Sequence, residues 1–504
     1  MLFIILTGCN FLFAQKKTKQ APKQTVTRYG YFPRSVFYDI YVPSFCDFNN
    51  DSIGDIKGIT HQLNYISSFG AEAVTLSPLT WTLDKDKKGS IDFQTIDPQL
   101  GTLADLKELI TEAHKLNINV VLSLNINYTG LQHPWFVQAE KNYEFQSYYI
   151  WKKSPDIKNL KKNFYELKKY SDKYYSYESS ELPCLNYSNV KVRNAVIAAC
   201  KYWLLQTNAD GIKFQEADKI YTGNDSEKLK FWGVMVKELQ KAKPGCFIIA
   251  QPSAEFSEYE KMVSENFNAC VTYGLTQFIH SNIIAGKDGG IVMNYNAMHD
   301  SLYKASHGFL DMLVTGHEQS IRLTQGLTPQ QTKAAVALLL TMPPSVSVFY
   351  GDELGMTGTT SRRNNLEPFA WNYTEADDNR TFYIPDEINN NAEIVPYAVQ
   401  LSDGNSLYHF YRKLCWIRKQ NDILREGSVI AAQNDDKRLV AFYRDMKTRR
   451  LLILQNISGS DVYYDLEKDR TFKFKNLFSN SVYPATEVGA VKISPYATLI
   501  YQSN

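Results

Sequence analysis

From residue 35 onward the chain alternates short runs rich in β-branched residues with longer stretches of helical period. The predicted strands are residues 36–42, 73–76, 119–126, 211–214, 246–250, 269–273, 312–315 and 346–350. The helical patterns include residues 103–116, 190–205, 227–242, 329–340 and 406–420. Eight such units in succession predict an α/β fold, a closed (β/α)8 TIM barrel with its functional side chains at the carboxyl ends of the strands.

Two segments depart from this alternation. Residues 129–185, after the third strand, are too long for an ordinary loop and contain the aromatic, lysine-rich stretch FYELKKYSDKYYSYE, which predicts an inserted domain. After residue 420 the short alternating runs LVAFYR, LLILQNI and TLIYQ indicate an antiparallel β domain. We therefore expect a barrel over 34–129 and 186–422, an inserted domain over 130–185 and a C-terminal β domain over 423–504.

The N-terminal segment is apolar and short. Residues 1–14 (MLFIILTGCNFLFA) carry no charge and fall short of the roughly 20 residues of a membrane-spanning helix, which predicts a signal peptide and an exported protein. Cleavage after Ala14 is favoured. The alternative is a lipid anchor at Cys9, because LTGC resembles a lipoprotein processing site. Residues 15–33 are expected to form a polar linker.

The composition excludes some classes of binding partner. The 504 residues include 55 Lys and Arg against 53 Asp and Glu, and a net charge of +2 gives no field that would recruit nucleic acid or an anionic membrane. The 33 Tyr and 27 Phe indicate an aromatic core, with stacking platforms for sugar rings as the alternative. The seven Cys show no paired spacing, so we expect mostly buried thiols.

Several long motifs occur in a characteristic order: VFYDIYVPSF, GDIKGITHQLNYISSFGAEAVTLSP, IDPQLGTLADLKELITEAHKLNINVVL, QHPWF, DGIKF and VSVFYGDELGM. Over residues 35–420 they resemble the α-amylase superfamily of glycoside hydrolases (family 13), particularly its oligo-α-glucosidase-like branch. The resemblance implies that the insert is the family's B domain. It also implies a retaining mechanism on α-linked glucans, which needs a carboxylate nucleophile and a carboxylic acid about 5 to 5.5 Å apart.

The catalytic positions implied by this resemblance are altered. The nucleophile position at the end of the fourth strand is Gln215, and the acid/base position at the end of the fifth is Gln251. An amide can neither form a glycosyl ester nor protonate a leaving oxygen. Only the position of the transition-state stabiliser keeps a carboxylate, as Glu318, which is one methylene longer than the family's Asp. We expect these three residues at one mouth of the barrel.

The expected substrate-binding positions are also changed, except for His317. Lys213 replaces the family's Arg, whose planar fork would hold the nucleophile. The family's third-strand pattern Asp-x-x-x-Asn-His ends in this chain with Asn127 and Tyr128. The position of the family's sugar-stacking pair of residues corresponds to the region of Lys88.

Neighbouring acids are poor replacements for the missing carboxylates. If the fourth strand continues through Glu216, its side chain faces away from the mouth, since successive residues of a strand alternate. Asp218 and Glu255 are interpreted mainly as caps at helix starts.

An oxygen-rich loop follows the first strand. Asp47, Asn49, Asp51 and Asp55, with Ile53 between them, fit D-x-N-x-D-x-x-x-D, a spacing that suits a hard cation such as Ca²⁺. Asp and Asn also gather in turns for backbone reasons. Because the resemblance places a calcium loop here, a bound Ca²⁺ is the favoured interpretation.

Three functional hypotheses follow, in order of preference. The first is a catalytically inactive, exported protein that binds α-glucan or malto-oligosaccharide. The second is an active but atypical α-glucosidase or α-amylase that uses Glu318 and a displaced acid. The third is a non-catalytic partner subunit, whose protein partner the sequence does not identify.

Overall fold

The computed structural model describes residues 34–84, 87–153, 164–167, 170, 172–176, 179–220, 224–253, 267–305, 310–318, 320–343, 345–358, 365–373, 377–383, 394–466, 475–477 and 490–502. The expected signal peptide (1–14), the linker (15–33) and Glu255 lie outside these residues. No helix in the described part is long and apolar enough to cross a membrane.

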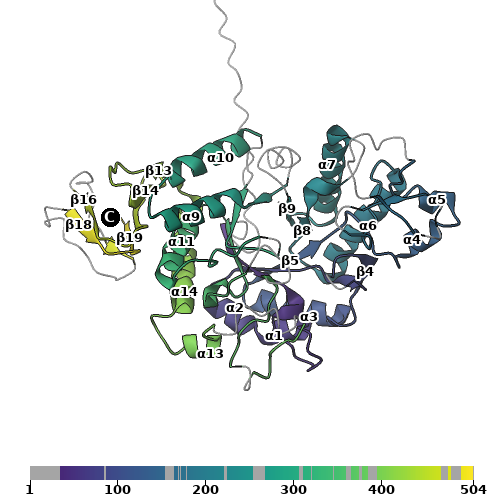
Figure 1. The fold of residues 1–504 in the computed structure, drawn as a ribbon, viewed down its shortest axis with the longest axis horizontal. Coiled ribbons are helices and arrows are strands. Elements are labelled where there is room, and N and C mark those ends of the chain that lie inside the picture. The colour runs from purple at the N-terminus through teal and green to yellow at the C-terminus, as the bar shows by residue number, and fades with distance from the viewer. Residues whose placement is uncertain are drawn as a thin grey trace, which may run out of the picture.

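Eight parallel strands close into a barrel at the centre of the molecule (Figure 1). They are β1 (Val36–Ile40), β2 (Ala73–Leu76), β5 (Asn119–Leu124), β8 (Gly211–Gln215), β9 (Phe247–Gln251), β10 (Ala269–Thr272), β11 (Leu310–Val314) and β12 (Ser345–Phe349). The pairing of β1 with β12 closes the ring. The predicted barrel is confirmed, and the near-continuous apolar runs reflect strands covered on both faces.

The helices around the barrel are α1 (Ile56–His61), α2 (Leu63–Phe69), α3 (Leu103–Lys115), α6 (Val190–Thr207), α7 (Asp225–Ala242), α9 (Gly274–Ala285), α10 (Ile291–Ala305), α11 (Pro329–Thr341), α13 (Tyr397–Gln400), α14 (Leu407–Gln420) and α15 (Asp422–Glu426). Local chemistry sets their starts: Thr102 and Asp105 form a capping box at α3, and Thr328 and Gln331 form one at α11. Each helix expected from the sequence is present.

The inward face of the barrel changes from apolar to polar toward the carboxyl ends of the strands. Phe37 and Ile249 belong to a buried cluster inside the barrel. Because residues two apart on a strand share a face, Asp39 follows Phe37 on the inward face and Gln251 follows Ile249. The polar layer therefore marks the mouth where the loops meet.

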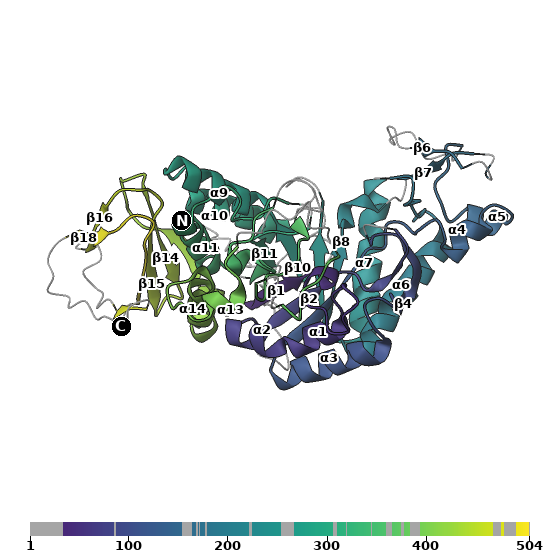
Figure 2. The ribbon, with the colours of Figure 1, turned by 60° about the horizontal axis from the view of Figure 1, so that its bottom comes forward.

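Two further parts lie at opposite ends of the barrel (Figure 2). The insert after β5 contains α4 (Pro134–Gln138), α5 (Tyr143–Gln146), β6 (Phe164–Tyr165) and β7 (Tyr174–Tyr175), near the hairpin of β3 (Thr80–Thr82) and β4 (Ser90–Ile96). The C-terminal part has a sheet ordered β13-β14-β15-β19-β17 and a pair β16-β18. These strands are β13 (Ser428–Ala431), β14 (Leu439–Asp445), β15 (Arg450–Asn456), β16 (Val462–Asp465), β17 (Lys475–Asn476), β18 (Ala490–Ile493) and β19 (Thr498–Gln502).

A buried arginine joins the C-terminal sheet to the barrel. Arg444 of β14 has no exposed surface. Its Nη1 donates to the carbonyls of Thr341 at 2.6 Å and Leu424 at 2.7 Å, and its Nη2 to that of Gly427 at 2.7 Å. Thr341 ends α11, so the guanidinium satisfies carbonyls that a helix end leaves unpaired.

The described cysteines agree with the expectation of buried thiols. Cys46, Cys184, Cys200, Cys246, Cys270 and Cys415 are all free and buried. Burial raises the pKa of the Cys246 thiol to about 11, so it stays protonated and unreactive at neutral pH. Cys9 lies outside the described residues.

A buried carboxyl group lies beneath the barrel loops. Glu353, in the short helix after β12 (Asp352–Leu354), has no exposed surface. Its Oε1 accepts a hydrogen bond from the hydroxyl of Tyr38 at 2.5 Å and another from Tyr65. Burial raises the pKa of Glu353 from 4.5 to about 7, and the two hydroxyl donors only partly oppose this.

This pKa predicts that stability falls as pH rises. The folded state holds the Glu353 proton more tightly than the unfolded chain, so its contribution is full below pH 4.5 and is lost as pH rises through about 7. Between pH 5 and 8 the loss should be about 2 to 3 kcal/mol. Urea unfolding of Glu353→Gln should lack this decrease. Glu112→Gln, at a partly exposed carboxylate paired with Lys115, should keep the decrease. The same dependence of unfolding free energy on pH in both variants would contradict the prediction.

Candidate active site

The strand ends bring the three expected catalytic positions together. Gln215 ends β8 and Gln251 ends β9, and the two are register partners in the parallel pair. Glu318 follows β11, and its Oε1 accepts a hydrogen bond of 3.0 Å from Nε2 of Gln215. Because the carboxyl ends of parallel strands open onto one side of a barrel, these positions share a mouth, as the sequence predicted.

His317 provides a neutral ring beside Glu318. Its imidazole lies against the ring of Tyr273, with centroids 4.1 Å apart. Burial lowers the pKa of His317 to about 3, with a further decrease from the charge of Lys213, while Glu318 acts in the opposite direction. The imidazole is therefore uncharged at neutral pH and can either donate or accept a hydrogen bond.

Lys213 forms an ion pair inside the barrel wall. Its Nζ lies 3.0 Å from Oδ1 and 2.8 Å from Oδ2 of Asp39, and both residues are buried. Burial raises the pKa of Asp39 and the charge of Glu318 adds to this, while Lys213 opposes it. Lys213 was expected to bind substrate. In the structure its ammonium is instead directed to β1, because an unpaired charge at this depth would be costly.

Asn127 and Tyr128 contact protein groups at the end of β8. Nδ2 of Asn127 donates to the carbonyl of Glu216 at 3.1 Å. The hydroxyl of Tyr128 accepts a hydrogen bond from Asn125 at 2.7 Å and donates to Oε2 of Glu216 at 3.3 Å. Tyr128 is only 1% exposed. These two positions, expected to contact sugar, therefore shape the wall of the mouth from behind.

The strand does not continue through Glu216. β8 ends at Gln215, and Glu216 adopts the left-handed conformation with φ of 50°. The alternation expected for a continuing strand therefore does not apply. The turn directs the carboxylate of Glu216 into the buried space beside Asn125 and Tyr128.

The remaining candidates lie in loops around the mouth. Lys88 precedes β4, and its backbone N–H donates to Asp84 at 3.0 Å. Asp218 accepts a hydrogen bond of 2.6 Å from the backbone N–H of Ser253 and pairs with Lys219 at 2.8 Å. Asp218 therefore joins the loops after β8 and β9, whereas we expected it to cap a helix.

The calcium loop is folded by its own backbone. The carboxylate of Asp47 accepts hydrogen bonds from the N–H groups of Asn50 and Ser52, and Asp51 accepts one from Ile53. Asp55 caps α1 through the N–H of Gly58 at 2.8 Å. Within the described residues no three His, Cys, Asp or Glu side chains form a metal-ligand group. The oxygen chemistry suits Ca²⁺, and the site remains a prediction.

Comparison with known proteins identifies the family. Residues 39–427 match the family described as "Alpha amylase, catalytic domain", and residues 439–500 match "Alpha-amylase SusG C-terminal domain". The chain belongs to the α-amylase family of glycoside hydrolases. This α-amylase-family chain is 27% identical to "Alpha-amylase 3" of Dictyoglomus thermophilum, over 93% of both chains. It is 24% identical to "Oligo-1,6-glucosidase" of Parageobacillus thermoglucosidasius, over 94% of this chain and 99% of the relative.

The fold agrees with a solved member of the family. The crystal structure of the alpha-amylase from H. orenii superposes with a TM-score of 0.82 at 23% identity, covering 94% of this chain and 100% of that one. The resemblance expected from the motifs is therefore confirmed at the level of family and fold.

The carboxyl groups near Gln215 are already bonded to protein partners. Asp39 is paired with Lys213 and Glu318 accepts from Gln215. Glu216 accepts from Tyr128. A retaining α-amylase needs one free carboxylate for attack and one carboxylic acid placed about 5 to 5.5 Å away. At the ends of β8 and β9, where the resemblance leads us to expect this pair, the chain carries the amides Gln215 and Gln251.

Sequence reasoning missed Asp39, Asn125 and Tyr273 as parts of the mouth. Asp39 carried a detectable signal, because an acid on the inward face of a buried strand needs a partner. Asn125 and Tyr273 had no comparable signal. Their roles depend on Glu216 and His317, which are distant from them in sequence.

The Lys213–Asp39 pair predicts a strong dependence of stability on both partners. Lys213→Met leaves a buried carboxylate without its cation and should reduce the free energy of unfolding by roughly 3 to 5 kcal/mol. Adding Asp39→Asn should recover most of this loss in urea unfolding. Lys201→Met, which breaks a partly exposed pair with Glu238 at 3.0 Å, should cost less than about 1 kcal/mol. A double variant no more stable than Lys213→Met would contradict this.

Proposed function

We propose that this protein is an exported member of the α-amylase family that binds α-glucan or malto-oligosaccharide without hydrolysing it. The observation that carries the proposal is the pair of amides, Gln215 and Gln251, at the ends of β8 and β9. Neither can act as nucleophile or general acid, and the adjacent carboxylate of Glu318 is bonded to the amide of Gln215.

Binding of glucan is supported by the polar groups of the mouth and by the relatives. Gln215, Gln251 and His317 offer neutral donors and acceptors, which can bond sugar hydroxyls without a charged partner. The relatives carry names such as "Alpha-amylase 3", "Oligo-1,6-glucosidase" and "4-alpha-glucanotransferase", all of which imply α-glucan ligands. Export is proposed from the apolar segment 1–14, with cleavage after Ala14 and lipid attachment at Cys9 as the alternative.

One observation favours a second candidate, an atypical hydrolase. The charge of Glu318 contributes to raising the pKa of Asp39, the direction that favours a carboxylic acid over a carboxylate. Glu318 would then act with a displaced acid. This candidate ranks second because Asp39 is paired with Lys213 and Glu318 with Gln215.

Calorimetry with maltoheptaose, run beside a reducing-sugar assay on the same preparation, tests the proposal. We expect binding, with turnover roughly 10⁶-fold below that of an active enzyme, because the catalytic groups act as a unit. For the same reason Gln215→Asp alone should not restore hydrolysis. Adding Gln251→Glu still leaves Lys213 and Tyr128, which shape the mouth.

A matched pair of variants locates the binding. Gln251→Leu should weaken maltoheptaose binding roughly fivefold, since a hydrogen bond is worth about 1 kcal/mol, whereas Gln206→Leu, at an exposed position of α6, should have no effect. If the wild type turns over substrate at an ordinary rate and Glu318→Gln abolishes this turnover, the protein is the atypical hydrolase instead. If the protein shows neither binding nor turnover, the partner-subunit hypothesis remains.

The loop over residues 47–55 is proposed to hold one Ca²⁺ that stabilises the fold and takes no part in chemistry. A ligand that binds only the folded state adds about 2.7 kcal/mol at a free concentration of ~100 times its Kd. EDTA should therefore lower the Tm and added Ca²⁺ restore it. Asp51→Ala should lose this response, while Asp403→Ala, at an exposed loop, should keep it. No shift with EDTA, together with no metal by elemental analysis, rejects the site.

A further inference from the structure

The B domain leaves the barrel and returns to it through two neighbouring chain segments, which form its neck. The backbone N–H of Thr129 donates to the carbonyl of Pro183 at 3.1 Å, and that of Leu185 donates to the carbonyl of Asn127 at 3.0 Å. Tyr128 and Cys184 form an antiparallel bridge between these bonds. Tyr128 therefore lies where the chain leaves the barrel and returns to it.

Tyr128 contacts both parts of the molecule. Its ring belongs to a small core of the B domain with Ile150, Leu182 and Cys184. Its hydroxyl bonds to Asn125 and to the carboxylate of Glu216, which lie on the barrel side. One buried side chain thus connects the packing of the B domain with the end of β8.

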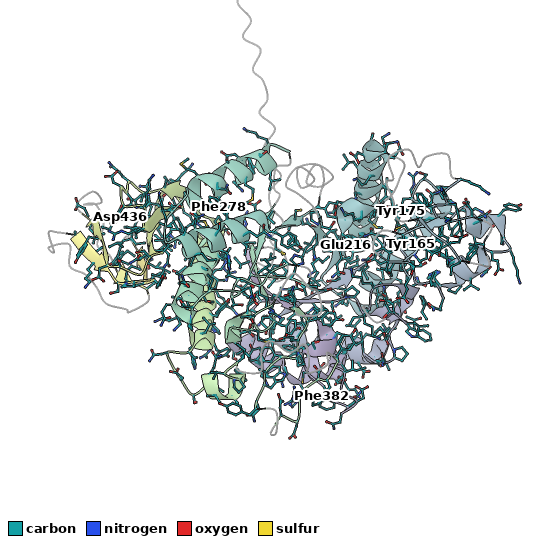
Figure 3. All side chains as sticks on the ribbon, viewed as in Figure 1. Tyr165, Tyr175, Glu216, Phe278, Phe382 and Asp436 are labelled. Carbon is teal, nitrogen blue, oxygen red and sulfur yellow. The ribbon has the colours of Figure 1, made fainter. Side chains whose placement is uncertain are left out.

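Glu216, which accepts the hydrogen bond from Tyr128, directly follows Gln215 in the chain. Its left-handed backbone, with φ of 50°, is uncommon for a residue with a side chain and needs support from neighbours. Tyr128 and Asn125 bond its carboxylate, at 3.3 and 3.4 Å, and Asn127 bonds its carbonyl at 3.1 Å. Figure 3 shows Glu216 between the barrel and Tyr175 of the B domain.

We propose that Glu216 is a positioning residue: through Tyr128 it ties the B domain to the turn after β8 and fixes Gln215 in the mouth. Its effect on glucan affinity rests on the proposed function. Because Tyr128 and Asn125 both donate to Oε2 of Glu216, the tie also orients the B domain against the mouth. Nothing in this role requires Glu216 to touch the ligand.

Hydrogen exchange and calorimetry test this tie with three variants. Tyr128→Phe removes the hydroxyl and keeps the ring, so backbone exchange over residues 213–217 should rise about tenfold and maltoheptaose affinity should fall at least fivefold. Glu216→Ala should act in the same way. The double variant should show no further rise in exchange and no further loss of affinity than either single variant. Glu216→Gln keeps an acceptor and should restore affinity to within about twofold of the wild type.

The matched control is Tyr149→Phe. It removes another hydrogen bond at the neck, between the hydroxyls of Tyr149 and Thr129 at 2.9 Å, which does not reach Glu216. Exchange over 213–217 and glucan affinity should then stay unchanged. Equal effects of Tyr128→Phe and Tyr149→Phe, or no effect of Tyr128→Phe on exchange, would overturn the proposal.

The exchange experiment needs no ligand. If the wild type binds no glucan, the proposed function fails, while exchange over 213–217 still decides whether the tie exists. If the wild type binds and Tyr128→Phe raises exchange with unchanged affinity, the proposed role in binding is overturned.

Discussion

The closure of the parallel barrel is the constraint on which the candidate site depends. Once β1 pairs with β12, the carboxyl ends of all eight strands open on one side, and the residues that end or follow them must share one mouth. Gln215, Gln251 and Glu318 come from three separate strand–helix units, yet the first two are register partners and the third bonds the first.

Within this mouth, charge balance explains why the amides suit their surroundings. Lys213 is committed to Asp39, so no cation remains on β8 to stabilise an ionised side chain at residue 215. An Asp there would face Glu318 and Asp39 with one shared lysine, and like charges in a poorly solvated space repel strongly. Gln215 avoids this repulsion and donates a hydrogen bond to Glu318. Lys213 and Gln215 are therefore compatible with each other.

The B domain provides a second influence on the position of Gln215. It is inserted between β5 and α6, and it contacts the rest of the chain through its neck, through apolar packing and through an ion pair between Lys191 of α6 and Glu144 of α5. Tyr128 provides a further connection, with its ring in one part and its hydroxyl in the other. A change in the B domain can thus reach Gln215 through packed, bonded side chains without moving the barrel strands.

The sequence by itself determined the barrel, the insert, the C-terminal β domain and the identity of the strand-end residues. These follow from hydrophobic period and motif order, which depend only on neighbours along the chain. Tertiary structure decided which groups those residues meet. Asp39 pairs with Lys213 across 174 positions, and Glu216 reaches Tyr128 only because its backbone turns left-handed after β8. Such contacts depend on the closure of the barrel and the neck of the insert, and no local pattern encodes the distance between segments so far apart.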